Sequence, residues 1–118
     1  RGGCVAAVAG ACDLGAWAMS AFLIKVSDGA ELPTFKTIAG MNQVRHDDDF
    51  IEGIGMFSSA KAHDMLVNTA VAGTVDEYEL SFSDGTQWHG ACTVVLVENM
   101  GERNGEPTYR VVLAKFAA

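Results

Sequence analysis

The chain has 118 residues and a mass of 12.5 kDa, which is enough for one domain with one hydrophobic core. Apolar residues make up 49% of it and charged residues 19%, a balance typical of a folded globular chain and not of a disordered one. Fifteen acidic residues against eight basic ones give a formal charge of −7. Because such a chain repels a phosphate backbone, tight binding of nucleic acid is not expected.

The three cysteines have neither the number nor the spacing of a structural framework. Cys4, Cys12 and Cys92 form no CxxC or Cys/His pattern, and an odd count does not suit a set of disulfides. We therefore predict no metal site from them and a reduced, cytosolic setting for assembly, with a Cys4–Cys12 bridge as the alternative.

The first twenty residues differ in composition from the rest, since Ala and Gly dominate them. Asp13 interrupts the apolar run, which is too short and too broken for a membrane span and a poor secretion signal. Met19 is a possible natural initiator, and residues 1–18 are then an extension or an arm that packs on a neighbour. We assign residues 1–20 to an N-terminal arm and residues 21–118 to a single domain.

The first half of that domain is predicted to be mainly β structure. Apolar residues that alternate or are β-branched, bounded by turn residues, favour strands. The predicted strands are residues 21–26, 34–38, 41–45 and 50–57. Asp28 and Gly29 form the first predicted hairpin turn, and Ala39–Gly40 is expected to end the second strand.

The most polar run is His46, Asp47, Asp48 and Asp49. Three adjacent carboxylates repel one another, so we predict an exposed loop that is solvated or contacts a partner. An EF-hand-like cation site is the rejected alternative, because Glu52 and Gly53 do not fit its register.

One helix is predicted after the fourth strand. Ser58 and Ser59 offer capping hydroxyls, apolar residues recur at helical spacing over residues 60–72, and Gly73 is a stop signal. The helix is therefore placed at about residues 59–72.

The C-terminal part is predicted to contain two hairpins. The alternating strand Tyr78–Phe82 turns at Asp84 and Gly85 and returns through Trp88, so that residues 78–97 form the first hairpin. Residues 99–105 are predicted as a turn before a last strand at 108–116, with Asn104 and Gly105 as the hairpin pair. Trp88 is interpreted as a packing or interface anchor. The fold class is therefore α+β, mainly β: a β-sandwich or rolled sheet flanked by one α-helix.

No set of residues forms a catalytic constellation. Ser58, Ser59, His63, Asp64 and Cys92 are the only candidates, and none has a paired base, a nucleophile elbow or a phosphate-binding loop. His63 and Asp64 point some 100° apart on a helix, which does not suit acid–base work. We therefore predict a protein that is not an enzyme, with no catalytic residues, cofactor or metal.

The order of these segments resembles the major tail tube proteins of long-tailed bacteriophages and gene transfer agents. The resemblance covers about residues 21–116 and rests on LIKVSDG, FKTIAG, GMF before a short helix, YELSFSDGTQWHG and NGEPTYRVVLAKF. Within these segments, the matching positions are Asp28-Gly29, Asp84-Gly85, Gly90, Asn104-Gly105-Glu106 and Tyr109.

What the resemblance implies is a structural virion protein with no membrane span. Six subunits would form a ring, rings would stack into a tail tube, and DNA would pass without specific binding. The partners would be other copies and other tail proteins, and the location would be the virion tail, after assembly in the host cytoplasm. The two Asp-Gly hairpins would offer edges that pair with neighbouring subunits and close a sheet that one subunit cannot close alone.

One feature departs from the family pattern. Family members usually carry a long loop before the strand that leads to the helix, and only residues 46–49 stand there in this chain. The alternative is therefore a related ring component, such as a tail terminator, baseplate or type VI secretion tube-like protein that does not stack on itself. The candidate contacts between subunits or rings are Arg45, His46, Asp47, Asp48, Asp49 and Trp88.

Overall fold

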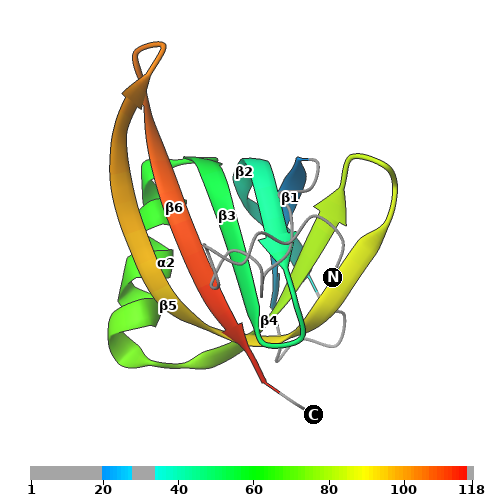
Figure 1. The fold of residues 1–118 in the computed structure, drawn as a ribbon. Coiled ribbons are helices and arrows are strands. Elements are labelled where there is room, and N and C mark those ends of the chain that lie inside the picture. Colours follow the sequence, from blue (N-terminus) through cyan, green and yellow to red (C-terminus); the bar gives the residue numbers. More distant parts are fainter. Residues whose placement is uncertain (1–19, 28–33, 117–118) are drawn as a thin grey trace, which may run out of the picture.

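The fold is a closed antiparallel β-barrel with one helix, seen in a computed structural model that describes residues 20–27 and 34–116. The elements are β1 (Ala21–Ser27), β2 (Thr34–His46), β3 (Phe50–Phe57), α2 (Ala60–Ala72), β4 (Val75–Phe82), β5 (Gln87–Arg103) and β6 (Glu106–Lys115). Neighbouring strands pair in the order β1-β2-β3-β6-β5-β4, and β4 pairs with β1 to complete the barrel (Figure 1).

The prediction of a β-sandwich or rolled sheet is wrong. β1 pairs with β2 along one edge and with β4 along the other, so that Phe22 stands opposite both Gly40 and Ser81. These pairings close the sheet on itself within one chain. The idea that neighbouring subunits are needed to close it is wrong for the same reason.

Two long strands replace shorter predicted ones. β2 is continuous through Ala39–Gly40 and absorbs a bulge between Met41 and Gln43, so those residues do not end a strand. β5 runs on to Arg103, so the predicted turn at residues 99–105 shrinks to Asn104 and Gly105. Both turn residues have positive φ, 56° and 82°, as a tight two-residue hairpin requires.

The predicted helix is confirmed. Ser59 caps α2, because its side chain accepts a hydrogen bond of 3.1 Å from the Ala62 N–H. Gly73 ends the helix with φ 69°, and its N–H donates to the Thr69 carbonyl at 2.9 Å. α2 packs mainly against β5. Its buried residues Ala62 and Leu66 belong to the same core as the barrel strands.

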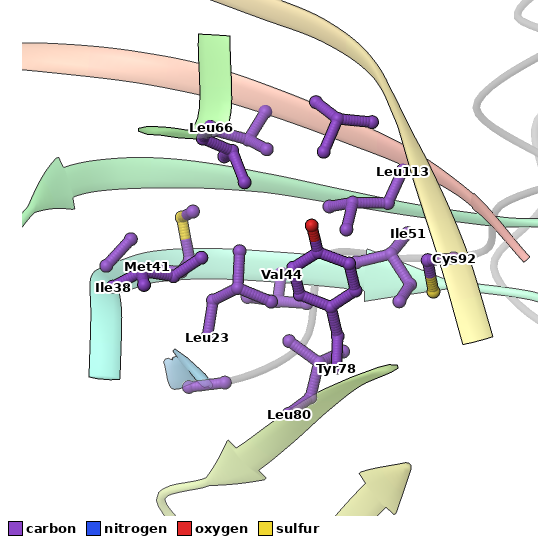
Figure 2. Packing of buried hydrophobic residues seen from close by; sticks show 14 of the residues in the cluster. Leu23, Ile38, Met41, Val44, Ile51, Leu66, Tyr78, Leu80, Cys92 and Leu113 are labelled. Carbon is purple, nitrogen blue, oxygen red and sulfur yellow. The ribbon is translucent and has the colours of Figure 1, made fainter. Parts of the chain in front are cut away.

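The core fills the barrel with aliphatic side chains and one tyrosine. Figure 2 shows Tyr78 among Leu23, Val44 and Ile51, with its hydroxyl in the same apolar cluster. Tyr78 is fully buried, and its hydroxyl has no hydrogen-bond partner within residues 20–27 and 34–116. Burial raises the pKa of this phenol, with smaller contributions from the charges of Asp76 and Cys92. A buried hydroxyl without a partner lowers stability.

Replacing Tyr78 with phenylalanine is therefore expected to stabilise the fold. The change removes the buried hydroxyl and keeps the ring, so the free energy of unfolding should rise by about 1 kcal/mol. Urea unfolding followed by circular dichroism measures this. Tyr109→Phe is the matched control, since Tyr109 is only half-buried, and it should change stability little. A loss of stability in Tyr78→Phe would contradict the account.

Candidate functional site

The barrel has two different ends. β2, β4 and β6 run in one direction, because each alternates with an antiparallel neighbour, and they finish at the same end. α2 follows β3 at the opposite end, where the β5–β6 hairpin also turns. Among the predicted contact residues, His46, the acidic turn after it and Trp88 all lie at the first end. The ribbon of β5 and β6 rises from the second end (Figure 1).

The first end carries a cluster of aromatic and basic side chains: His46, Phe82, Trp88 and Lys115. The His46 ring stacks on Phe82, with centroids 5.6 Å apart and planes at 28°, and lies 6.4 Å from the Trp88 ring. The Lys115 ammonium stands 4.5 Å from the centroid of Trp88 and 3.0 Å from Nδ1 of His46. We call these four residues the end cluster.

The acidic turn is held in shape by its own first carboxylate. Oδ1 of Asp47 accepts hydrogen bonds from the N–H groups of Asp49 and Phe50, each at 2.8 Å. Slight burial raises the pKa of Asp47, but these two hydrogen bonds and the Lys115 charge outweigh it and lower the pKa. Asp48 and Asp49 are exposed. Over the described ranges, no three His, Cys, Asp or Glu side chains converge as a metal site would need.

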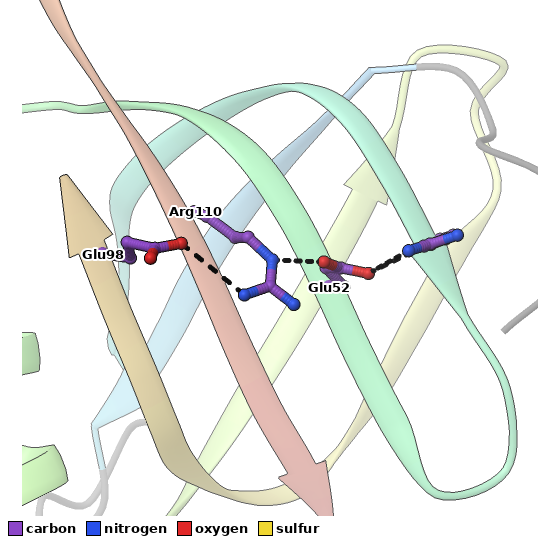
Figure 3. Close-up of polar contacts among 4 residues, drawn as sticks. Glu52, Glu98 and Arg110 are labelled. Atoms are coloured by element: carbon purple, nitrogen blue, oxygen red, sulfur yellow. Dashed lines mark hydrogen bonds and ion pairs between the residues drawn. The ribbon is translucent and has the colours of Figure 1, made fainter. Parts of the chain in front are cut away.

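Arg45 lies apart from the end cluster and takes part in a chain of charges across four strands. Glu52 is almost completely buried, 3% exposed, and accepts hydrogen bonds from Arg45, at 2.7 Å, and from Arg110. Arg110 also reaches Glu98 at 3.6 Å (Figure 3). Burial acts to raise the pKa of Glu52, but the two guanidinium groups lower it overall. Nothing in the sequence indicates this chain of charges, because Glu52 and Arg110 are 58 residues apart and come together only through the pairing of β3 with β6.

The ribbon of β5 and β6 extends beyond the rest of the barrel (Figure 1). β5 pairs with β4 only as far as Thr93 and with β6 from Cys92 to Arg103. Within the described part of the chain, β5 therefore has a neighbouring strand on one side alone from Val94 onward. Met100 is a large apolar residue exposed on the part of this ribbon that leaves the barrel. Val95, 55% exposed, lies at the base of the ribbon, opposite the part of β6 that still pairs with β3.

A second exposed apolar surface lies on the outside of β1, β2 and β3. Strand register places Phe22, Gly40 and Met56 in one row across these strands. Phe22 is 58% exposed. Its ring lies beside Gly40, where an added methyl group would stand 3.6 Å from the ring, an ordinary contact distance. We call this row the outer groove; polar residues, including Ser20, Asn42 and Ser58, line its sides.

The remaining predicted residues fall into three places. Asp84 and Gly85 lie in the turn between β4 and β5, where Oδ1 of Asp84 accepts from the N–H of Thr86 at 2.9 Å. Asn104 and Gly105 form the tip of the ribbon. Asp28 and Gly29 lie outside the described residues, as does most of the predicted arm at 1–20.

His63 and Asp64, the residues considered for acid–base chemistry, do contact each other. Nδ1 of His63 lies 3.0 Å from Oδ1 of Asp64, and the His63 ring packs near Phe57 and Tyr109, with centroids 5.2 and 4.8 Å away. The contact belongs to an aromatic cluster that joins the start of α2 to β3 and β6. In the described part of the chain, no serine hydroxyl or cysteine thiol is hydrogen-bonded to the His63 ring; the backbone N–H of His63 donates to the Ser59 carbonyl at 3.2 Å.

The chain is similar to few known proteins. The chain matches no protein-family model and no curated protein sequence. Among solved structures, it is similar to a chain of the "Tail of empty GTA particle computed with helical refinement, C6 symmetry", with 18% identity, coverage of 89% of this chain and 81% of that chain, and a TM-score of 0.49. The described part of the chain contains no helix long and apolar enough to cross a membrane.

Proposed function

We propose that this protein is a structural subunit of a phage or gene transfer agent tail, that six copies form a ring, and that rings stack into the tube through which DNA passes. The resemblance of the ordered sequence motifs supports the class of protein. The observation that carries the proposal is the ribbon of β5 and β6, which leaves the barrel with one edge unpaired in the described structure.

A ribbon of this kind favours association with another copy. Two strands alone are marginally stable in water, and an open strand edge offers backbone N–H and C=O groups to any extended partner. Val95 and Met100 add apolar surface that is exposed in the single chain. A neighbouring subunit that covers the ribbon would satisfy the edge and bury these side chains.

The position of the second apolar surface supports a ring. In the barrel order, β2 at the centre of the outer groove and β5 at the base of the ribbon are three places apart in either direction. They therefore lie on opposite sides of the barrel. A contact between two different surfaces of the same subunit is head-to-tail, and it generates a ring when the rotation closes.

The charge of the chain suits passage of DNA without binding. Six copies at −7 each give 6 × −7, or −42 formal charges per ring. Such a ring releases few counterions from DNA and holds it weakly. In this proposal the protein has no catalytic activity and no cofactor, its partners are further copies and other tail proteins, and it resides in the virion tail after assembly in the host cytoplasm.

One observation favours the alternative of a ring component that does not stack on itself. β2 and β3 are joined by only Asp47–Asp49, and this turn is closed by its own hydrogen bonds. The long loop that family members use to contact the next ring is replaced here by a compact turn. A tail terminator, a baseplate subunit or a type VI secretion tube-like protein would fit this feature.

Negative-stain electron microscopy at tens of micromolar protein tests the proposal. Rings or tubes with a central hole are expected, and tubes would distinguish the stacking subunit from the alternative. Monomers alone at that concentration, in several salts, would contradict both.

A pair of variants tests the role of the ribbon. Val95→Lys places a charge on β5, whereas Val71→Lys makes the same change on α2 at a residue that is 85% exposed. Because burying a valine contributes about 1.5–3 kcal/mol, Val95→Lys should raise the concentration needed for assembly at least about tenfold. Val71→Lys should assemble like the parent, and equal effects of the two changes would contradict the role of the ribbon. Light scattering against concentration gives the readout.

A further inference from the structure

The end cluster contains a hydrogen bond that only one protonation state of histidine can make. Nζ of Lys115 and Nδ1 of His46 are 3.0 Å apart. A lysine ammonium has donors and no acceptor, so the imidazole nitrogen facing it must accept. His46 is therefore neutral when this contact is formed, with its proton on Nε2.

The same ammonium fastens three strands at their ends. Lys115, the last residue of β6, also donates to the carbonyl oxygen of Asp47, just after β2, and stands over the ring of Trp88 on β5. The backbone N–H of Lys115 donates to the Asp49 carbonyl at 2.7 Å. Loss of the contact to His46 removes one of the links that hold the end of β6 against β2.

The other groups around His46 do not offset a second positive charge there. Phe82 of β4 and Trp88 of β5 face it with uncharged rings. The Asp47 carboxylate is the negative charge that acts on His46, and it is engaged by two backbone N–H groups of its own turn. Burial lowers the pKa of Lys115, and the charges of Cys92, Asp48 and Asp49 oppose that shift. The charge of Glu77 acts in the same direction as burial on the pKa of Cys92 and raises it. Cys92 is buried and its pKa is raised to about 11, so it is a neutral thiol near pH 7.

We propose that the end cluster is an acid-sensitive latch: protonation of His46 places two cations side by side, breaks the hydrogen bond from Lys115 and loosens the end of β6 from β2, which the two backbone carbonyl contacts of Lys115 then hold alone. The aromatic face of Trp88, now covered by the Lys115 ammonium, becomes accessible when the latch opens. This inference is independent of ring formation, because every contact in it lies within one chain.

The direction of the pH effect follows from the contacts. Burial and the charge of Lys115 lower the pKa of His46 from its usual 6.5, and Asp47 opposes them only in part. A histidine whose pKa is lowered by folding binds fewer protons in the folded than in the unfolded state. The stability it contributes is complete above pH 6.5 and is lost as the pH falls from 6.5 through the folded pKa.

Proton-detected NMR of the imidazole carbons tests the latch in the unaltered cluster. The described chain contains His46, His63 and His89, and the single variants His63→Gln and His89→Gln assign two signals, which leaves His46 as the third without any change at that residue. The His46 signal is expected to titrate with a midpoint below pH 6.5 and to report the Nε2–H tautomer above it. A midpoint at or above 6.5 would overturn the proposal.

Two further readouts separate a latch from a merely structural contact. Lys115→Met removes the second cation and should move the His46 midpoint upward toward 6.5, whereas a fixed midpoint would contradict the role of Lys115. A Trp17→Phe background leaves Trp88 as the remaining tryptophan. With the quencher acrylamide present, its fluorescence should change at the same pH midpoint as the NMR signal of His46. His89→Gln is the matched control and should leave that transition in place. Fluorescence that stays constant across the His46 titration would show that the latch does not open.

Discussion

Replacing Gly55 with alanine is expected to prevent the barrel from folding or to destabilise it by more than about 4 kcal/mol. Gly55 lies in β3 opposite Met41 of β2. A methyl group on Gly55 would stand 2.0 Å from the carbonyl oxygen of Gly40 and 2.6 Å from the Cα of Met41. Both atoms belong to the backbone of the neighbouring strand, so relief requires the two strands to separate where β2 has its bulge.

Two other glycines supply matched controls for that prediction. A methyl group on Gly53 would stand 3.0 Å from Cγ and Sδ of Met41, a flexible side chain that can move, so Gly53→Ala should cost far less. On Gly40 the added carbon would lie at an ordinary 3.6 Å from Phe22. Thermal unfolding should therefore rank the losses as Gly55→Ala, then Gly53→Ala, then Gly40→Ala. A Gly55→Ala variant as stable as Gly40→Ala would show that the strands are not this close.

Local signals in the sequence were sufficient for the helix and for some of the strands. Ser59 and Gly73 bound α2 where predicted, because capping depends on residues within one turn of the helix. β3 also has its predicted range, 50–57, since polar residues limit it on both sides, Asp47–Asp49 before it and Ser58 and Ser59 after it. The predicted strand end at Gly40 was wrong, because pairing on both sides carries β2 through that glycine.

Closure of the barrel and the composition of the site depend on register between distant strands. Nothing near β1 in sequence indicates that β4 will pair with it, because β4 starts about fifty residues later. His46 and Trp88 were both singled out, yet their neighbour Lys115 was not, since it is 69 residues from His46. Arg45 was predicted as a contact between subunits, which stays a prediction, and its contact with Glu52 was not foreseen, because Glu52 was considered only as a metal ligand.

That buried carboxylate gives the second large effect. Glu52→Gln is expected to lower the free energy of unfolding by about 3 kcal/mol, because it removes the negative charge that Arg45 and Arg110 share in a nearly water-free position. Glu98→Gln makes the same change at Glu98, the other carboxylate that contacts Arg110. Glu98 is 53% exposed and 3.6 Å from Arg110, so Glu98→Gln should lower the free energy of unfolding by less than about 1 kcal/mol. Urea unfolding at pH 7 compares the two.

The pH dependence of stability separates the charge of Glu52 from its shape. Folding lowers the pKa of Glu52 from 4.5, so the folded protein binds fewer protons at this site than the unfolded chain. The stability from Glu52 is therefore present above pH 4.5 and is lost as the pH falls through its folded pKa. As the pH falls below 4.5, Glu52→Gln should lose stability less steeply than the parent. The difference between their free energies of unfolding should therefore narrow. A gap that stays constant down to acid would mean that packing of the side chain, and not its charge, explains the loss at pH 7.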